Sequence, residues 1–173
     1  MKKKYLFKIV LTGILVALNI ILERFLAYSV WNMTISFGFI TVAFAAVMLG
    51  LPYAIAVGGL GDLIGALLFP FGPYFPGFTL TNILAAAVLA VFIHKKTSII
   101  NITIATVINK ICFTLILNSI WISILYRGGI SKFFVVAIPR IWSAVILGII
   151  EIIVISVIFS EKSKIRKQLN KLI

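Results

Sequence analysis

Charged side chains are scarce in this sequence, and acidic side chains are almost absent. Only 12% of the 173 residues are charged, and Asp and Glu together number four. A soluble domain carries roughly 25% charged residues, because its surface must face water. Hydrophobic residues make up 62% of this chain instead, and its mean hydropathy is +1.22. The composition excludes an ordinary soluble domain and predicts one membrane domain over residues 1–173.

Cysteine and histidine are equally scarce, with one residue of each type, Cys112 and His94. A single cysteine inside an apolar run provides neither a disulfide nor a cysteine-ligated metal site within one chain. The sequence also contains no Walker A pattern, no HExxH motif and no Ser/His/Asp set. We therefore predict no catalytic residues, no cofactor and no metal site. The chain is expected to bind a ligand rather than to act as an enzyme.

Long apolar runs dominate what is present. A membrane-spanning helix needs about 20 apolar residues, and runs of that length without period-2 alternation indicate helices rather than barrel strands. The predicted spans cover about 5–28, 34–51, 53–69, 78–93, 98–126 and 132–160. The fold class predicted from them is an all-α membrane protein, a bundle of six transmembrane helices. The third and fourth spans are short and rich in glycine, so we expect them to be tilted, broken or sheltered by neighbours.

The basic residues that give a net charge of +12 cluster at both ends and in the turn from His94 to Lys96. Lys and Arg beside apolar spans mark the cytoplasmic side of a membrane, and they attract anionic lipid headgroups. The charge therefore indicates orientation and contact with lipid, and not nucleic-acid binding. With an even number of spans, both termini are predicted to be cytoplasmic and the protein to lie in the cell membrane.

The stretch from Leu49 to Thr81 is the most informative part of the sequence. Its glycines at positions 58, 59, 61 and 65 place small residues along a helix, which lets neighbouring backbones approach closely. Asp62 lies among them, and a carboxylate inside a membrane is costly unless it faces a partner or a water-filled cavity. Two interpretations stay open for Asp62: a ligand contact, or a structural hydrogen bond to a neighbouring helix.

An aromatic loop from Pro70 to Phe78 follows on the outer side. Its three prolines and two glycines restrict the backbone to a defined shape. Its aromatic residues, among them Tyr74 and Phe75, would either form an interfacial belt or wall a pocket for a flat ring. The density of proline and glycine favours the shaped wall.

Two arginines lie in the outer half of the predicted helices, where an unpaired guanidinium is penalised. Arg24 is near the outer end of the first span, and Arg140 is about two turns into the sixth. A guanidinium is suited to bind a carboxylate with two parallel hydrogen bonds. The structural alternatives are that Arg24 reaches the lipid headgroups and that Arg140 pairs with Asp62 or Glu23.

Further polar residues accompany these arginines. Glu151 follows Arg140 by eleven residues, about three helical turns, and so lies on nearly the same face. Asn118 and Trp121 are three residues apart and share a face of the fifth span, while Lys110 lies nearer its cytoplasmic end. The pattern is consistent with an outward-facing pocket that has aromatic walls, an amide, an acid and one or two arginines.

The first span also carries a pair of small residues, Gly13 and Ala17, at a spacing of four. Leucine and isoleucine surround this pair, and such a face allows another helix to dock closely. The pair is common by chance in apolar sequence. The pair alone therefore does not establish a docking face for a partner helix.

Taken together, the sequence resembles the substrate-binding S components of energy-coupling factor (ECF) vitamin transporters, and the folate type above all. The most specific part of the resemblance is GDLIGALLFPFGPYFPGFTLT, from Gly61 to Thr81. The family resemblance implies high-affinity binding of a vitamin from the outside. It also implies partners: a transmembrane coupling subunit, for which Gly13 and Ala17 match the docking motif, and two cytoplasmic ATPases. The loop from Pro70 to Pro76, with the first outer loop at about Ser29 to Asn32, would close the pocket.

The resemblance implies folate as ligand, a flat pterin joined to a dianionic glutamate tail. The pterin would stack on an aromatic ring or bind an amide or acid, and the tail would bind an arginine. The candidate ligand contacts are Arg24, Asp62, Tyr74, Phe75, Asn118, Trp121 and Arg140. Two alternatives stay open: an S component for another small vitamin such as thiamin or riboflavin, and a membrane enzyme or self-sufficient transporter.

Overall fold

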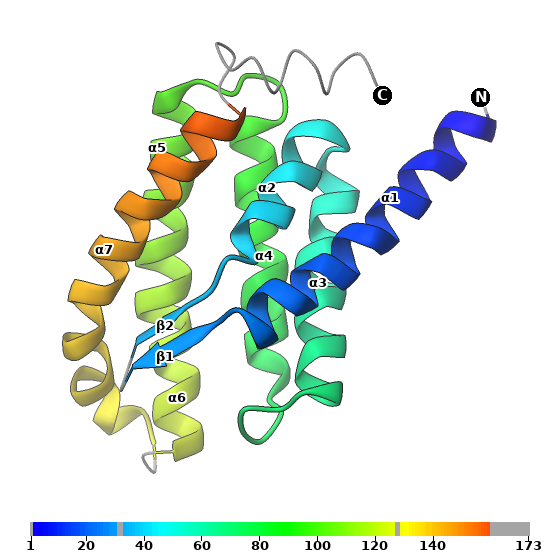
Figure 1. Cartoon of the computed structure of the whole chain (residues 1–173). Helices are drawn as coiled ribbons and strands as arrows, with labels where there is room; N and C mark the ends of the chain where they lie inside the picture. Colours follow the sequence, from blue (N-terminus) through cyan, green and yellow to red (C-terminus); the bar gives the residue numbers. More distant parts are fainter. Residues whose placement is uncertain (1, 31–32, 127–128, 160–173) are drawn as a thin grey trace.

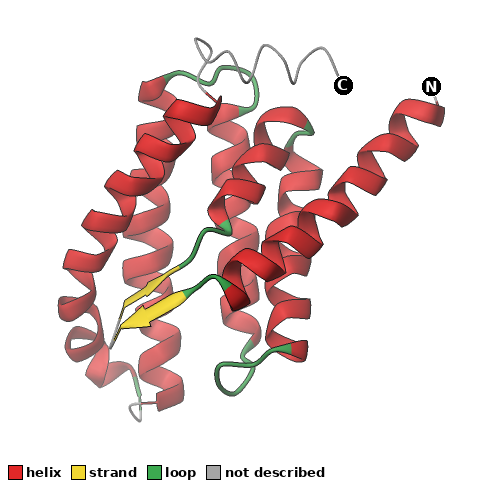
Figure 2. Ribbon diagram, viewed as in Figure 1, coloured by secondary structure: helices red, strands yellow, loops and turns green. Residues whose placement is uncertain are grey.

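The structure, a computed structural model, describes residues 2–30, 33–126 and 129–159. Within these ranges the chain forms a helical bundle with one short β-hairpin (Figures 1 and 2). The elements are α1 (Lys2–Ile20), η1 (Ile21–Phe25), β1 (Tyr28–Val30), β2 (Met33–Ile35), α2 (Phe39–Met48), α3 (Leu51–Leu68), α4 (Pro76–Ile93), α5 (Ile99–Ile108), η2 (Asn109–Leu117), α6 (Asn118–Tyr126), η3 (Ile130–Lys132) and α7 (Phe133–Phe159). The predicted fold class, an all-α membrane bundle, is confirmed.

Five helical segments of the described chain are long and apolar enough to cross a membrane. They are α1 with η1, α3, α4, the continuous run from α5 through α6, and η3 with α7. The second predicted span, 34–51, was too long: its helix α2 has ten residues. Gly38 precedes this helix, and Gly50, at φ +99°, follows its end. The third and fourth spans are the shortest, with continuous helices of 18 residues each, and they are more buried than the other spans, so of the three expectations they are sheltered by neighbours rather than broken.

A two-stranded antiparallel sheet replaces the end of the first predicted span and the beginning of the second. Its register pairs Tyr28 with Ile35 and Val30 with Met33, and Figure 2 shows it as a ribbon between α1 and α2. The two strands pair the backbone groups that face each other, and the groups on their outer edges need other partners. Of the predicted closing loop at Ser29 to Asn32, Ser29 and Val30 lie in β1, and residues 31–32 lie outside the described residues.

The beginning of α1, the α4–α5 connection and the end of α7 lie on one side of the bundle, and the α3–α4 connection lies on the opposite side (Figure 1). Lys4, Lys8, Lys95 and Lys96 are on the first of these sides. This arrangement agrees with the predicted orientation, in which the basic side is cytoplasmic. We call the side with the α3–α4 loop the outer side.

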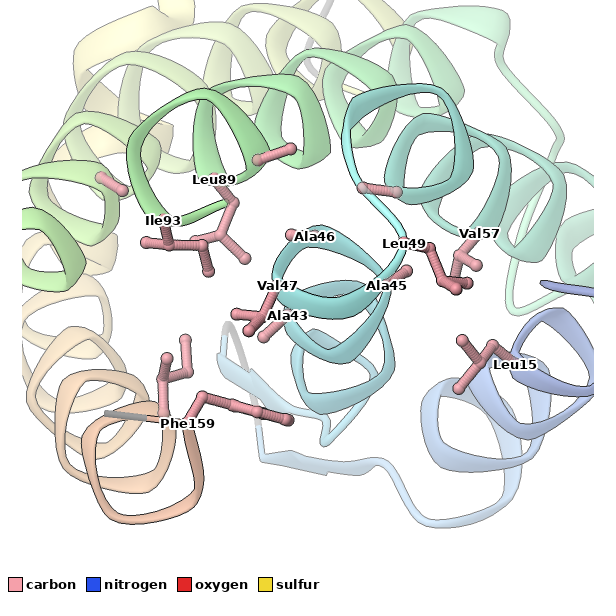
Figure 3. Close-up of a cluster of buried hydrophobic side chains, with 14 of the residues drawn as sticks. Leu15, Ala43, Ala45, Ala46, Val47, Leu49, Val57, Leu89, Ile93 and Phe159 are labelled. Carbon is pink, nitrogen blue, oxygen red and sulfur yellow. The ribbon is translucent and has the colours of Figure 1, made fainter. Parts of the chain in front are cut away.

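The short helix α2 occupies the centre of the bundle. Its alanines at positions 43, 45 and 46 are fully buried, and Figure 3 shows them between Phe159 of α7 and Leu15 of α1. Small side chains at these positions let the surrounding helices pack close to the α2 backbone. Large apolar side chains on α1 and α7, such as Ile14, Phe134 and Trp142, are exposed. An exposed apolar surface of this extent suits contact with lipid.

Glycines allow α3 to pack against its neighbours, as the sequence predicted. A Cβ on Gly59 would lie 2.7 Å from the Cγ1 of Ile83 on α4. A Cβ on Gly61 would lie 2.1 Å from the Oδ1 of Asn19 on α1. Both distances are far below van der Waals contact, so α3 is held against α4 on one side and α1 on the other.

Candidate ligand-binding site

Two adjoining cavities lie inside the bundle. The inner cavity has a volume of about 660 Å³ and extends between α2, α4, η2 and α7. The outer cavity has a volume of about 420 Å³ and lies beneath the α3–α4 loop. The residues that line both are Glu23, Ser36, Asn82, Asn118 and Tyr126. Because they share these walls, the two cavities form one path, and pockets of this size hold small organic ligands.

A polar network crosses the outer cavity. The Nη2 of Arg24 lies 3.5 Å from the Oδ1 of Asp62, and both side chains are almost fully buried, with exposed fractions of 12% and 10%. Thr79 donates a hydrogen bond of 2.7 Å to the Oδ2 of Asp62. The hydroxyl of Tyr74 lies 3.3 Å from that of Thr79. The network therefore links η1, α3 and α4 to the aromatic loop, and it gives Asp62 a structural partner, Arg24.

The aromatic loop covers the outer cavity. The guanidinium of Arg24 lies 5.1 Å from the ring centroid of Phe71, a cation–π distance. The ring of Phe75 lies 5.4 Å from that of Trp121. A Cβ on Gly77 would clash with both of these rings, so a glycine is required where α4 begins. The shaped wall expected from the sequence is present.

Trp121 itself lines neither cavity. Its Nε1 donates a hydrogen bond of 3.1 Å to the Oγ1 of Thr81 on α4, and its ring packs behind Phe75. Asn118, three residues earlier on the same helix, lines both cavities. The side chain of Trp121 thus supports the wall, and a direct contact with ligand stays a prediction.

The inner cavity contains an ion pair and a buried arginine. Lys110 of η2 and Glu151 of α7 form an ion pair, with side-chain exposed fractions of 15% and 16%. The Nη1 of Arg140 is buried and has no hydrogen-bond partner among the described residues. Since Asp62 pairs with Arg24, the proposed structural pairing of Arg140 with Asp62 is absent. The guanidinium of Arg140 remains available to a ligand.

The π-helical segment η2 shapes one wall of the inner cavity. It covers nine residues, and Asn109, Lys110, Phe113 and Thr114 from it line the cavity. A π-helix is wider than an α-helix and is frequent at functional sites. The change of helical period alters which side chains face inward, so the regular period of the sequence could not predict this wall.

Six of the seven candidate contacts predicted from the sequence line the cavities, and other lining residues were not predicted. Arg24, Asp62, Tyr74 and Phe75 line the outer cavity, Asn118 lines both, and Arg140 lines the inner one. Glu23, Lys110 and Glu151 were noted in the sequence but were not among the candidate contacts. What marked these three residues in the sequence was a charged side chain inside an apolar span. Asn82 and Tyr126 carried no such signal.

The charged residues that lie away from the ends of the membrane spans all line this path. Between residues 9 and 93, 97 and 126, and 133 and 159, the charged residues are Glu23, Arg24, Asp62, Lys110, Arg140 and Glu151. Charges are excluded from lipid-facing positions by their desolvation cost. Their common location marks the path as the functional interior of the bundle.

The small pair on α1 lies away from the cavities. Gly13 and Ala17 are exposed, and a Cβ on Gly13 would meet no atom within 4 Å. Neighbouring Val10, Ile14 and Leu18 are also exposed. The described chain leaves this face of α1 uncovered.

Comparison with known proteins agrees with this geometry. The family model "ECF transporter, substrate-specific component" matches residues 7–159. A curated folate transporter FolT from Clostridium novyi is 35% identical over 127 residues, which are 73% of this chain and 74% of that protein. A second, from Leuconostoc mesenteroides, is 32% identical over 120 residues, 68% of this chain and 64% of that protein. A solved structure, "Crystal structure of FolT bound with folic acid", matches with a TM-score of 0.77 and 31% identity, over 94% of this chain and 92% of that one.

Proposed function

The chain belongs to the family of substrate-specific components of ECF transporters, and from this membership we propose that it binds folate for uptake into the cell. As a member of this family it is a multi-pass cell-membrane transport component and not an enzyme. The observation that carries the folate proposal is the Nη1 of Arg140, which is buried on the wall of the inner cavity without a hydrogen-bond partner among the described residues, in a chain similar to folate transporters.

The cavity chemistry suits an elongated dianion with a flat ring. The glutamate tail of folate carries two carboxylates, and Arg24 and Arg140 present guanidinium groups to the path. The aromatic loop, with Tyr74 and Phe75, would cover the tail from the outside. Asn118 lines both cavities and would donate or accept a hydrogen bond at the middle of the ligand. The pterin would then enter the inner cavity.

Asp62 and Trp121 have indirect roles in this proposal. Asp62 holds the guanidinium of Arg24 at the cavity wall, and it would share this partner with a ligand carboxylate. Trp121 fixes the position of Phe75 through ring contact and its hydrogen bond to Thr81. Both residues would therefore affect affinity through the groups they position.

The test is equilibrium binding of folic acid, thiamin and riboflavin to the purified protein. We expect binding of folic acid alone, and a response to one of the other vitamins instead would refute the folate assignment. Arg140→Ala removes a hydrogen-bonding charge and should weaken folic acid binding about 10- to 100-fold. Val145→Ala, a half-exposed position of the same helix, serves as the matched control. Unchanged affinity in Arg140→Ala would remove this residue from the site.

We also propose that Gly13 and Ala17 dock the transmembrane coupling subunit, and that ATP hydrolysis occurs in two cytoplasmic partner ATPases. The support is that this face of α1 is apolar, exposed and free of bulky side chains at both positions. Gly13→Leu and Ala17→Leu should abolish co-purification with the coupling subunit and leave folic acid binding intact. Full uptake in cells that lack the coupling subunit and ATPases would instead favour a self-sufficient transporter.

A further inference from the structure

The ion pair of Lys110 and Glu151 has no role in the proposal so far. The pair lies on the wall of the inner cavity, far from the aromatic loop. Burying two charges inside a membrane protein is expensive, and apolar residues of similar size would often be at least as stable. The pair is therefore a poor choice for stability alone, and its position on the cavity wall suggests contact with ligand.

Local packing holds the pair in place. The Cγ of Lys110 would lie 3.4 Å from a Cβ on Gly148, so the lysine stem lies across α7 at this glycine. Glu151 follows Gly148 by three residues and lies on the same face of α7. The stem of Lys110 is thus directed along α7 toward the carboxylate of Glu151.

Each partner keeps hydrogen-bonding capacity for the cavity. Lys110 donates to the Oε1 of Glu151, and an ammonium has two more donors. The Oε2 of Glu151 has no hydrogen-bond partner among the described residues, and it is not among their fully buried unpaired atoms. The pair presents donors beside an acceptor to whatever enters the cavity.

A pterin carries the complementary pattern on its pyrimidine edge. The 4-oxo oxygen accepts a hydrogen bond, and the adjacent N3–H and 2-amino groups donate. We propose that Lys110 and Glu151 recognise this edge: Glu151 accepts from N3–H and the 2-amino group, and Lys110 donates to the 4-oxo oxygen. The inference rests on the proposed binding of folate and assigns the end of the cavity at which the pterin lies.

The spacing on α7 supports this orientation. Glu151 and Arg140 line the same cavity and are eleven residues apart, which is about 16 Å along the helix axis and nearly the same face. Folate is elongated, with its donor edge at one end and its carboxylates at the other. One helix can therefore offer an acceptor to the pterin and a guanidinium to the tail.

The experiment is a cycle of two proteins and two ligands. Binding of folic acid and of its 2-desamino-2-methyl analogue is measured for the wild type and for Glu151→Gln. If Glu151 accepts from the 2-amino group, the wild type should prefer folic acid about 10- to 100-fold. Glu151→Gln should lose most of that preference, because the preference comes from the hydrogen bond between the 2-amino group and the Glu151 carboxylate.

A neutral double variant, Lys110→Met with Glu151→Gln, controls for folding because it leaves no unpaired charge in the span. It should also lose the preference for folic acid. The inference is overturned if the wild type binds both ligands equally, or if either variant keeps the full preference. If the wild type binds no folic acid, the proposed function itself fails, and the two failures are distinguishable.

Discussion

Gly61→Ala tests whether the contact between α3 and α1 is as close as the structure has it. The new methyl group would lie 2.1 Å from the Oδ1 of Asn19 and 2.8 Å from its Cγ. Asn19 is fully buried and cannot swing into solvent. Its Nδ2 donates to the backbone oxygen of Gly38 at 3.1 Å and to the Oγ1 of Thr41 at 3.0 Å. The methyl group can be accommodated only if these bonds break or α1 moves away.

The expected cost follows from those two hydrogen bonds. Each buried group left without a partner lowers the unfolding free energy by about 1–3 kcal/mol. Alanine in place of glycine raises it by about 1 kcal/mol, because alanine has the higher helix propensity. The net loss is about 1–5 kcal/mol of unfolding free energy. For a chain of this length, that should lower the melting temperature by about 2–20 °C.

Thermal unfolding of the purified protein in detergent is the assay, with Gly13→Ala as the matched control. Gly13 is on the same helix as Asn19 and would meet no atom within 4 Å, so its alanine variant should be at least as stable as the wild type. In an Asn19→Ala background only the Cβ at position 19 remains, 3.2 Å from the new methyl group, so Gly61→Ala should then cost less. A melting temperature within about 1 °C of the wild type would refute the close contact, as would an equal cost in both backgrounds.

Asp62→Asn removes the partner of Arg24 and one negative charge from the outer cavity, so we expect a lower melting temperature without ligand and tighter binding of folic acid. Weaker binding would contradict this and would mean that holding Arg24 in place, or a direct contact with the ligand, is the larger effect of Asp62. Trp121→Phe keeps the ring beside Phe75 but loses the hydrogen bond to Thr81, so unfolding free energy should fall by about 1 kcal/mol and affinity less than fivefold. A loss above tenfold would instead make Trp121 a ligand contact. Folic acid affinity should depend weakly on salt, because the charges along the path balance; a steep dependence would contradict that balance.

The sequence was sufficient for the class, the helical spans and much of the outer cavity. Apolar run length predicts membrane helices because lipid allows few other structures. Gly61, Gly65 and Asp62 mark a helix face that packs closely, because any larger residue meets a neighbour there. These signals are local, and each can be recognised without knowledge of the rest of the fold.

The rest depended on contacts between distant residues. Arg24 and Asp62 are 38 positions apart, and Lys110 and Glu151 are 41 apart. No period relates the members of either pair, and each acid could pair with several bases until the helices are placed. The segment from residue 109 to 117 adds a second obstacle, because its π-helical turn rotates the faces that a regular helix would predict.

The shortened second span has a similar cause. Residues 28–35 are apolar enough to read as helix, yet they pair as two strands. Hydropathy reports whether a segment is apolar, and it does not distinguish a helix from a short hairpin whose outer edges are sheltered by the rest of the protein. Gly38 follows the hairpin and lies against the side chain of Glu23, where a Cβ would clash, and such a contact between residues 15 positions apart is not visible in hydropathy.

The distribution of charge along the path explains how a membrane interior can select an anion without an excess of positive charge. Three acids and three bases line it, and they make two ion pairs, Arg24 with Asp62 and Lys110 with Glu151. Formal charges therefore cancel, and the long-range attraction for a dianion is small. What remains is local: the Nη1 of Arg140 is buried without a hydrogen-bond partner among the described residues. A ligand carboxylate placed there relieves a desolvated charge, whereas a neutral ligand leaves it unsatisfied. Selectivity for the anion then arises from the positions of the two guanidinium groups, because the Nε of Arg24 is also buried without a hydrogen-bond partner among the described residues.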